Sequence, residues 1–242
     1  QLTTPADPSE CVLAGIDQLL GREGVTLADV RVVAHGTTLI TNSVIERKGA
    51  KTAMLVTDGF LDVLDVGMES RYDLFDLRIE YADPVVPRRL RRGIPERLRH
   101  DGSVQLSLDE QAVKDAARSL VEDHACEALA VCFLHAYVNP AHEQRAAAIV
   151  AELYPDFPIS TSSDVVPVMR EFERWSTTTI NAYTQPLAAR YLGRIERALA
   201  ERGFGGAFLI MTSSGGAVTV SEAQRWPVRL IESGPAAGAL MA

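Results

Sequence analysis

The chain has 242 residues, of which 47% are apolar and 23% are charged. These proportions are those of an ordinary globular protein and exclude a disordered, collagen-like or coiled-coil chain. The net charge of −8 disfavours nucleic acid as a partner, because an acidic surface repels phosphodiester backbones. No stretch approaches the ~20 consecutive apolar residues that span a bilayer, so no membrane association is expected.

The chain ends and the cysteines give further expectations. The chain begins at Gln1 without an initiator Met and ends on an apolar run, which favours a piece of a longer protein. Three cysteines without a CxxC pair, and no signal peptide in the sequence as given, favour a reducing cytoplasm. Cys126 and Cys132 lie in or beside an apolar run and are expected to be small core residues.

Helices and strands are predicted to alternate in the first third of the chain. Apolar residues at helical spacing behind Asp7 and Pro8 predict a helix that ends by Gly24. Short apolar runs that stop at glycine predict buried strands. The expected elements after the first helix are a buried strand over 31–35, a helix over 38–48, a buried strand over 52–57 and a short helix over 60–66.

The middle of the chain predicts a hairpin followed by a parallel βαβ unit. Prolines mark residues 71–107 as irregular, and Asp101-Gly102 predicts a hairpin turn. The elements expected next are a helix from about 108 to 123, a central strand over 127–134, a helix over 140–153 and a strand over 157–161. Near-continuous apolar strands alternating with helices indicate an α/β fold with helices on both faces of the sheet.

The last third predicts a long helical region and a further buried strand. Two helices, over 169–185 and 187–202, are expected to be interrupted at Pro186. A buried strand is expected over 207–211. A soft domain boundary is placed near residue 180, which gives domains 1–180 and 181–242.

The first candidate site is the loop His35-Gly36-Thr37-Thr38, followed by Asn42, where a strand ends and a helix begins. In open α/β sheets ligands bind at the carboxyl ends of strands, and helix N-termini offer N–H groups to anions. Threonine and asparagine add neutral hydrogen-bond donors. The alternative is a helix cap in which Thr37 or Thr38 satisfies the first turn.

Two other small-residue segments are candidates. Residues 212–216 (Thr-Ser-Ser-Gly-Gly) follow a strand, and paired glycines let a backbone approach a ligand closely, although a tight turn is the commoner explanation. Residues 232–238 (Glu-Ser-Gly-Pro-Ala-Ala-Gly) could cradle a phosphate, and Pro235 suits the first turn of a helix. They are not a P-loop, because Gly-Lys-Ser/Thr is absent.

Metal and nucleophile motifs are weak. Cys132, His135 and His142 have C-x2-H-x6-H spacing, but a structural role for His135 is commoner than a zinc site of this form, so no metal ligand is assigned. The sequence has no Gly-x-Ser-x-Gly elbow, and no Ser–His–Asp set can be assigned.

Two arginine-rich segments have a structural and a functional interpretation. Six arginines lie within residues 88–99 and could pair with nearby acids on a hairpin face or form a patch that docks an anion or a subunit. Arg170 and Arg174 are four residues apart and are expected to share a helix face. Surface pairing with glutamates is the default there, and an anion clamp is the alternative.

Several segments together resemble the A-type proteins of the hydantoinase/oxoprolinase family, in the right order and over essentially the whole chain. The segments that carry the resemblance are 33–38, 41–43, 46–50, 57–64, 134–143, 181–183, 213–216 and 233–238. The resemblance implies an actin-like ATPase fold of the sugar kinase/Hsp70 type, here the first lobe and part of the second.

The resemblance also implies an activity. Family members use ATP to phosphorylate the oxygen of a cyclic amide or ketone, and a B-type subunit or domain helps to complete hydrolysis. A hydantoin or 5-oxoproline amidase subunit is the first expectation. A subunit of an ATP-dependent ketone carboxylase and a non-catalytic actin-like assembly module are the alternatives. The substrate itself is not identified by the sequence.

The resemblance implies which catalytic parts to expect. Family members carry two Asp-x-Gly-Gly-Thr phosphate loops, and both are expected to lie outside residues 1–242, so ATP and Mg²⁺ are expected for the full-length protein and not tightly bound to this chain. A homo-oligomer is also expected.

The resemblance assigns roles to individual residues. Catalytic roles are carried over to Thr37, Thr38 and Asn42. Substrate- or phosphate-facing roles are carried over to His35, Gly36, Ser213, Ser214, Gly215, Gly216, Ser233 and Gly234. Family members often have Asn-Gly-Gly where this chain has Ser214-Gly215-Gly216, which removes any side-chain amide from that position.

Overall fold

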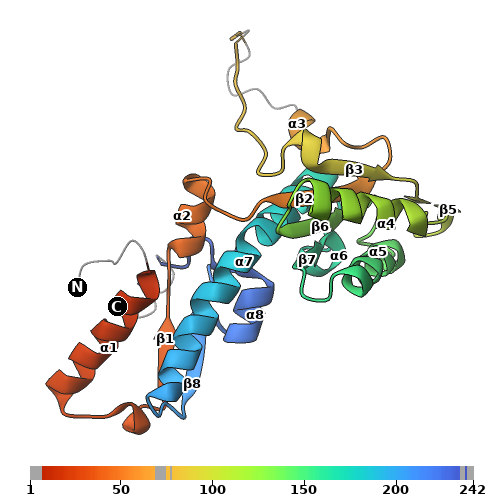
Figure 1. Ribbon diagram of the computed structural model, residues 1–242. Helices are drawn as coiled ribbons and strands as arrows, with labels where there is room; N and C mark the ends of the chain where they lie inside the picture. Colours follow the sequence, from red (N-terminus) through yellow and green to blue (C-terminus); the bar gives the residue numbers. More distant parts are fainter. Residues whose placement is uncertain (1–6, 69–74, 77, 235–237, 239–242) are drawn as a thin grey trace. The chain divides into compact units, whose positions relative to one another are not determined.

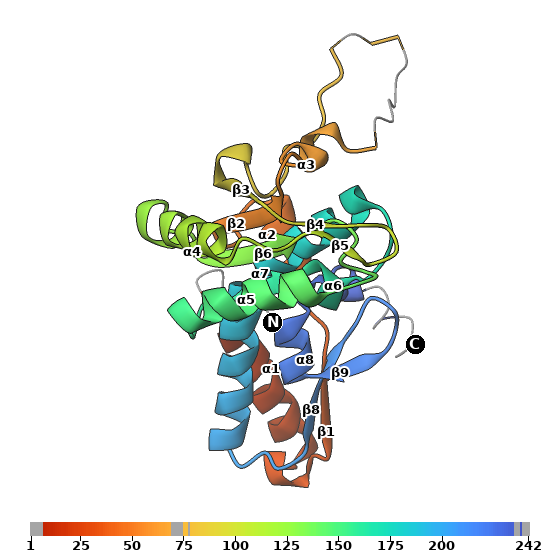
Figure 2. The ribbon, with the colours of Figure 1, turned by 90° about the vertical axis from the view of Figure 1, so that its right-hand side faces the viewer.

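The computed structural model describes residues 7–68, 75–76, 78–234 and 238. The chain divides into two compact units. Unit 1 consists of Gln1–Lys48 and Thr184–Ala242, and unit 2 consists of Gly49–Tyr183. Most elements of the two units are labelled in Figure 1, and β4 and β9 are labelled in Figure 2. The boundary near residue 180 describes sequence regions rather than compact units, and it stays a prediction.

Unit 1 is built on a three-stranded sheet in the order β1-β8-β9. Strand β1 (Val32–His35) pairs in parallel with β8 (Ala207–Met211), and β8 pairs antiparallel with β9 (Ala217–Thr219). Figure 2 shows the three strands side by side. The parallel register places His35 opposite Ile210, so β1 and β8 end at the same edge of the sheet.

The helices of unit 1 follow the expected signals. Helix α1 (Pro8–Glu23) begins behind Asp7, whose side chain accepts from the Ser9 N–H, and it ends at the left-handed Gly24. The other helices are α2 (Leu39–Ile45), α8 (Val220–Arg225), 3-10 turns over Leu27–Asp29 and Pro227–Leu230, and the C-terminal part of α7 (Glu171–Glu201). Their apolar side chains form one core around Ile210, Tyr191 and Leu192.

The expectation of fully buried strands is wrong for β1 and for the start of β8. Along β1, Val33 and His35 turn inward with Phe208 and Ile210, whereas Val32 and Ala34 are exposed. The described residues of unit 1 cover one face of this small sheet, so its strands alternate between a buried and a wet side.

Unit 2 contains a four-stranded, fully parallel sheet in the order β3-β2-β6-β7. The strands are β2 (Thr52–Thr57), β3 (Arg91–Ile94), β6 (Ala128–Cys132) and β7 (Ile159–Thr161). Every residue of β2 and β6 is buried, as the apolar runs predict. An antiparallel hairpin of β4 (Arg97–Leu98) and β5 (Val104–Leu106) turns at Gly102, which confirms the expected turn.

Helices lie on both faces of the unit 2 sheet, which confirms the βαβ prediction. Helix α4 (Glu110–Arg118), continued by a π-turn over Ser119–Asp123, packs beside α5 (Ala141–Leu153). Right-handed crossovers place these two on one face. On the other face Asn181 of α7 donates to Ser160 of β7, at 3.0 Å. Two short helices, α3 (Val63–Val66) and α6 (Ser162–Val165), and a 3-10 turn over Arg88–Leu90 complete the unit.

The predicted interruption at Pro186 is wrong, because α7 runs unbroken from Glu171 to Glu201 with the proline inside it. A proline in a helix removes one hydrogen bond and costs about 3 kcal/mol. The helix continues because residues on both sides of the proline are fully buried, among them Ala182 and Ala188. Packing over the whole length of α7 outweighs the local loss.

Two other helix predictions have wrong bounds. Helix α2 stops at Ile45 rather than 48, because Arg47 adopts a left-handed conformation and the Lys48 N–H donates to the Ser43 carbonyl at 2.9 Å. This is a Schellman end formed without glycine. The helix expected over 60–66 forms at Val63–Val66. No helix among the described residues is long and apolar enough to cross a membrane.

Candidate functional site

The loops predicted as functional follow the adjacent, parallel strands β1 and β8 of unit 1. His35 ends β1, and Gly36, Thr37 and Thr38 connect it to α2. Residues 212–216 follow β8 and lead into β9. Because β1 and β8 are neighbours in register, the two loops emerge from one edge of the sheet. We call them together the strand-end loops.

A chain of hydrogen bonds fixes the first strand-end loop. The Thr37 hydroxyl accepts from the Leu39 N–H at 3.1 Å, which caps the first turn of α2. The same side chain hydrogen-bonds to Tyr191, whose hydroxyl lies 3.0 Å from Nε2 of His35. The structural alternative for Thr37, a helix cap, therefore holds, and the hydroxyl also positions Tyr191.

Burial determines the charge of His35. Its ring packs against Tyr191 and Phe208, and burial lowers its pKa from 6.5 to about 4. The imidazole is neutral at pH 7, so the Tyr191 hydroxyl can donate to Nε2 while it accepts from Thr37. Burial also raises the pKa of Tyr191, which keeps this hydroxyl protonated.

Thr38 and Asn42 present polar groups at the surface. Thr38 is the residue before α2 and makes no side-chain cap hydrogen bond. Its hydroxyl lies 3.5 Å from the Asn42 amide nitrogen, at the limit of a hydrogen bond, and both side chains are exposed. A hydroxyl and an amide one helical turn apart form a pair of neutral donors beside the helix start.

The second strand-end loop is a closed turn. The N–H and the hydroxyl of Thr212 both donate to the Gly216 carbonyl, at 2.9 and 3.1 Å. Gly215 has a φ of 82°, which suits glycine. The tight-turn explanation therefore holds for the backbone, while the exposed Ser214 hydroxyl lies 3.0 Å from that of Thr212.

The third predicted segment lies against both loops. The Arg229 carbonyl accepts from the N–H and the hydroxyl of Ser213, at 2.9 and 3.1 Å. The Glu232 N–H donates to the Thr41 hydroxyl at 3.0 Å, and the buried Ser233 hydroxyl donates to the Thr37 carbonyl at 3.3 Å.

The structure therefore brings all three predicted segments of unit 1 together. Gly234 approaches Thr38 closely enough that an added Cβ would lie 3.7 Å from its methyl group. The expected helix start at Pro235 lies outside the described residues.

The spacing Cys132, His135 and His142 in unit 2 does not form a cluster. Nδ1 of His142 lies 2.7 Å from the buried Glu96 carboxylate, which also accepts from Thr57. Burial raises the pKa of the Cys132 thiol well above its usual range. Within the described ranges no group of three His, Cys, Asp or Glu residues could hold a metal ion. Cys126 and Cys132 are buried, which confirms their assignment to the core.

Glu143 gives the family-like segment 134–143 a structural role. Its buried carboxylate accepts from the Phe133 N–H at 2.8 Å, the Ser162 hydroxyl at 2.6 Å and the Ser163 N–H at 2.8 Å. Burial raises its pKa, while these donors oppose the rise. Glu143 thus ties the end of β6 to the start of α6.

The arginines at 88–99 mostly follow the structural interpretation. Arg88 pairs with Asp62, and the fully buried Arg91 side chain pairs with Asp65 and donates to the carbonyls of Leu61 and Val86. Arg97 stacks on the Phe60 ring, 4.8 Å from its centre. These cations already have partners within unit 2.

The expectation for Arg170 and Arg174 is wrong. Arg170 precedes α7 in a left-handed conformation, so the two do not share a helix face. Arg174 is fully buried rather than on the surface, and it donates to the Ser162 hydroxyl and to the carbonyls of Val168 and Phe133. Only Arg170 makes a surface pair, with Glu173 at 3.4 Å.

Two features of the structure were not predicted from the sequence, namely the contact of Tyr191 with His35 and a pocket in unit 2. Tyr191 lies inside a long helix, and nothing in its spacing links it to His35. A pocket of about 780 Å³ in unit 2 is lined from three separate segments, including Phe60, Leu134 and Phe172. The apolar side chains of Phe60, Val63, Val66 and Phe172 contribute to it, but only the strand order shows that these segments meet.

Family models match nearly the whole chain. The hydantoinase/oxoprolinase N-terminal region matches residues 1–154, and the hydantoinase/oxoprolinase model matches residues 174–242. The chain belongs to the hydantoinase/oxoprolinase family, as the resemblance of its motifs indicates.

Three relatives are each about a third identical to the chain over the aligned residues. An uncharacterized protein of Methanocaldococcus jannaschii is 35% identical over 98% of this chain and 35% of its own length. The caprolactamase subunit alpha of Pseudomonas jessenii is 35% identical over 97% of this chain and 34% of its own length. The acetone carboxylase beta subunit of Xanthobacter autotrophicus is 31% identical over 98% of this chain and 35% of its own length.

Two solved structures, of a caprolactamase and an acetone carboxylase, have the same fold as this chain. The crystal structure of the ATP-dependent caprolactamase from Pseudomonas jessenii superimposes with a TM-score of 0.88 at 34% identity, over 97% of this chain and 35% of that one. A nucleotide-free acetone carboxylase structure superimposes with a TM-score of 0.86 at 30% identity, over 99% of this chain and 36% of that one. The chain thus spans about a third of the length of the relatives it matches. The expected α/β, actin-like fold class is confirmed.

Proposed function

We propose that this chain is part of an ATP-dependent enzyme that opens a cyclic amide by phosphorylating the amide oxygen. The observation that carries the proposal is the meeting of the strand-end loops with residues 229–234 at one sheet edge. Family membership and the likeness to an ATP-dependent caprolactamase support the reaction class. Ligands of α/β sheets bind at such strand ends.

The exposed donors of this edge suit phosphate oxygens. The Thr38 hydroxyl, the Asn42 amide and the Ser214 hydroxyl are uncharged donors that can orient a phosphoryl group without holding it as tightly as an arginine would. Thr37 acts as a positioning residue, since its hydroxyl is engaged by Leu39 and Tyr191. Neutral His35 and Gly36 set the path of the loop.

ATP and Mg²⁺ are proposed as the cofactors. ATP supplies the phosphoryl group that turns the amide oxygen into a leaving group, and Mg²⁺ neutralises phosphate charge. The sequence contains no Asp-x-Gly-Gly-Thr loop, so residues 1–242 alone are proposed to hydrolyse no ATP. A B-type subunit, homo-oligomer formation and a cytoplasmic location are proposed for the full-length protein.

A ketone carboxylase subunit is the second candidate function, because the likeness to acetone carboxylase is nearly as close as that to caprolactamase. The test is phosphate release by the full-length protein with its partner subunits, across lactams, hydantoins, 5-oxoproline and ketones. Release with lactams or hydantoins and no bicarbonate supports the amidase. Release that requires a ketone and bicarbonate supports the carboxylase, and no substrate-stimulated release contradicts both.

A further inference from the structure

The pocket of about 780 Å³ in unit 2 lies where the strand order reverses. The chain leaving β2 turns toward β3, whereas the chain leaving the adjacent β6 turns toward β7. Gly59 and Phe60, which follow β2, and Leu134, which follows β6, line the pocket. The crevice between the carboxyl ends of two such strands is where open α/β sheets bind ligands.

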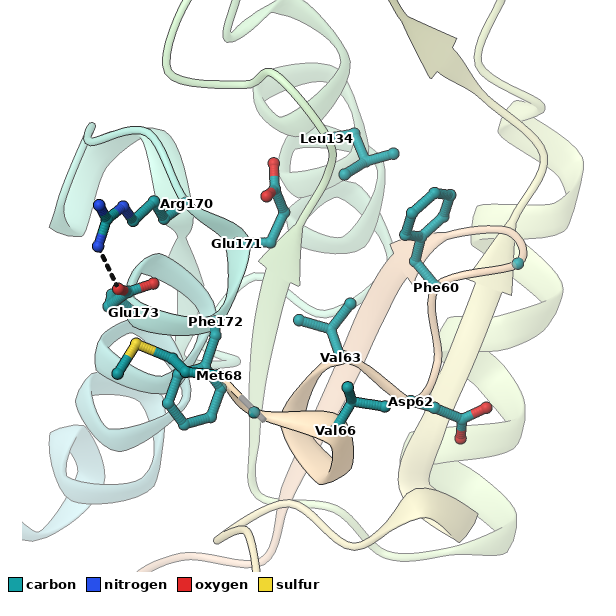
Figure 3. A pocket seen from close by; sticks show the side chains of 12 residues that line it. Phe60, Asp62, Val63, Val66, Met68, Leu134, Arg170, Glu171, Phe172 and Glu173 are labelled. Atoms are coloured by element: carbon teal, nitrogen blue, oxygen red, sulfur yellow. Dashed lines mark hydrogen bonds and ion pairs between the residues drawn. The ribbon is translucent and has the colours of Figure 1, made fainter. Parts of the chain in front are cut away.

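The walls of this pocket are mostly apolar. Figure 3 shows Phe60, Val63 and Val66 on one side and Phe172 with Met68 on the other. Val66 is 54% exposed and Met68 58% exposed, so these side chains are not filling the core. Exposed apolar side chains gathered around a hollow indicate a ligand with an apolar body.

Carboxylates dominate the charged groups of the pocket. Arg170 is its one lining cation among the described residues, and it pairs with Glu173 at 3.4 Å (Figure 3). Asp62 is paired with Arg88 outside the pocket lining. Three lining carboxylates against one lining guanidinium make the pocket unfavourable for an anion.

Glu171 offers an acceptor to a ligand. Its nearest cation is the buried Arg174 at 3.8 Å, which is too far for a hydrogen bond. The Arg174 donors are directed instead to the Ser162 hydroxyl and to the carbonyls of Val168 and Phe133. Arg174 therefore holds the start of α7 against the end of β6 and leaves the Glu171 carboxylate with acceptor capacity.

We propose that this pocket binds a small, uncharged organic molecule with an apolar body and an N–H group that donates to Glu171. A neutral lactam has this chemistry: its methylene ring suits the walls formed by Phe60, Val63 and Phe172, and its amide N–H suits the carboxylate. A lactam that bears its own carboxylate is rejected. This inference rests on the proposed function and narrows its substrate class to uncharged cyclic amides.

The test measures binding without nucleotide, using the whole chain with labelled methyl groups. The methyl signals of Val63, Met68 and Leu134 are followed by NMR at pH 7 during titration with caprolactam. A matched pair, 5-oxoprolinamide and 5-oxoprolinate, differs in charge on the same ring, and N-methylcaprolactam lacks the N–H donor. We expect saturable shifts at these methyls, with the uncharged amide at least about tenfold tighter than the anion and N-methylcaprolactam about tenfold weaker than caprolactam.

Variants separate the pocket from general effects. Val66→Lys places a charge at the exposed wall and should abolish the shifts, whereas Val104→Lys on the exposed face of β5 should leave them unchanged. Glu171→Gln removes a negative charge from the pocket and should reduce the difference in affinity between 5-oxoprolinate and 5-oxoprolinamide. Each variant is first checked for an unchanged spectrum outside the pocket. Met68→Lys replaces Val66→Lys if that variant does not fold, and binding is then followed at the methyl groups of Val63 and Leu134.

Equal affinity for 5-oxoprolinate and 5-oxoprolinamide would overturn the inference. Saturable binding that Val66→Lys does not weaken would also overturn it. So would the absence of saturable shifts at the methyl groups of Val63, Met68 and Leu134. Because nucleotide is absent, lactam binding without ATP-dependent turnover of the full-length protein would contradict the proposed function and leave the pocket assignment standing. ATP-dependent turnover of lactams by the full-length protein without lactam binding in this pocket would support the proposed function and contradict the pocket assignment.

Discussion

The hydroxyl of Tyr191 lies 3.0 Å from Nε2 of His35, although the two residues are 156 positions apart. This contact joins the end of β1 to α7 within unit 1, and Thr37 extends it to the start of α2. The predicted functional loop therefore depends on a residue that no motif contains.

Removing the Tyr191 hydroxyl should destabilise unit 1. Tyr191→Phe leaves a partly buried imidazole nitrogen and the Thr37 hydroxyl without this partner, which costs about 1–3 kcal/mol. Urea unfolding measures the change. Tyr154→Phe, which loses a hydrogen bond to Glu122 at an exposed site, is the matched control and should change stability by less than about 1 kcal/mol. Equal effects would show that the Tyr191–His35 contact has no special weight.

His35 should make stability depend on pH. Its folded pKa of about 4 lies below its ordinary value of 6.5, so protonation favours the unfolded chain. Its contribution is fully present above pH 6.5 and is lost as the pH falls toward 4, by up to about 3 kcal/mol.

The matched variant for this prediction is His35→Gln, which does not titrate and retains an acceptor for Tyr191. The free energy of unfolding is measured between pH 7 and pH 4 for both proteins. The variant should lose less stability over this range. Glu143, whose pKa burial raises, contributes equally to both and cancels. Parallel pH profiles would contradict the assignment of a buried, neutral His35.

Arg170 and Arg174 should differ sharply although they are four residues apart. Arg174→Met leaves the carbonyls of Val168 and Phe133 without their buried donor and should cost about 3–5 kcal/mol. Arg170→Met removes an exposed pair with Glu173 and should cost less than about 1 kcal/mol. Thermal or urea unfolding of the two variants distinguishes them, and similar losses would contradict the burial of Arg174.

Adjacent glycines before β8 offer a test of backbone packing. A Cβ at Gly206 would lie 2.4 Å from the Arg31 carbonyl oxygen, whereas one at Gly205 would contact nothing. Gly206→Ala should cost about 1–3 kcal/mol, and Gly205→Ala should change stability by less than about 0.5 kcal/mol. A stable Gly206→Ala protein would show that the β1–β8 pairing tolerates separation.

Local patterns predicted the elements well where one interaction determines them. Asp7 and Gly24 mark the ends of α1, and the apolar runs mark β2 and β6, because capping and burial act on neighbouring residues. Pro186 misled the prediction, since packing far along the chain keeps α7 intact. The exposure of Val32 also depends on what covers the sheet, which spacing does not show.

The candidate loops were predictable from their place after strands, and the structure brings them together. Their hydrogen-bonded partners were not predictable, because Tyr191 and Arg229 come from separate elements with unremarkable spacing. The unit 2 pocket was missed for the same reason. Its location follows from strand order, which depends on how β2, β6 and their neighbours pair.

The central claim is that the exposed donors of the first strand-end loop orient a phosphoryl group. The direct measurement is lactam-stimulated phosphate release by a full-length protein that carries this chain with its partner subunits, comparing Thr38→Ala with the unchanged protein. Loss of one such donor should lower turnover about 10²-fold. Thr219→Ala, which removes only the cap of α8, is the control and should retain turnover. Full turnover by the Thr38→Ala protein would contradict the account.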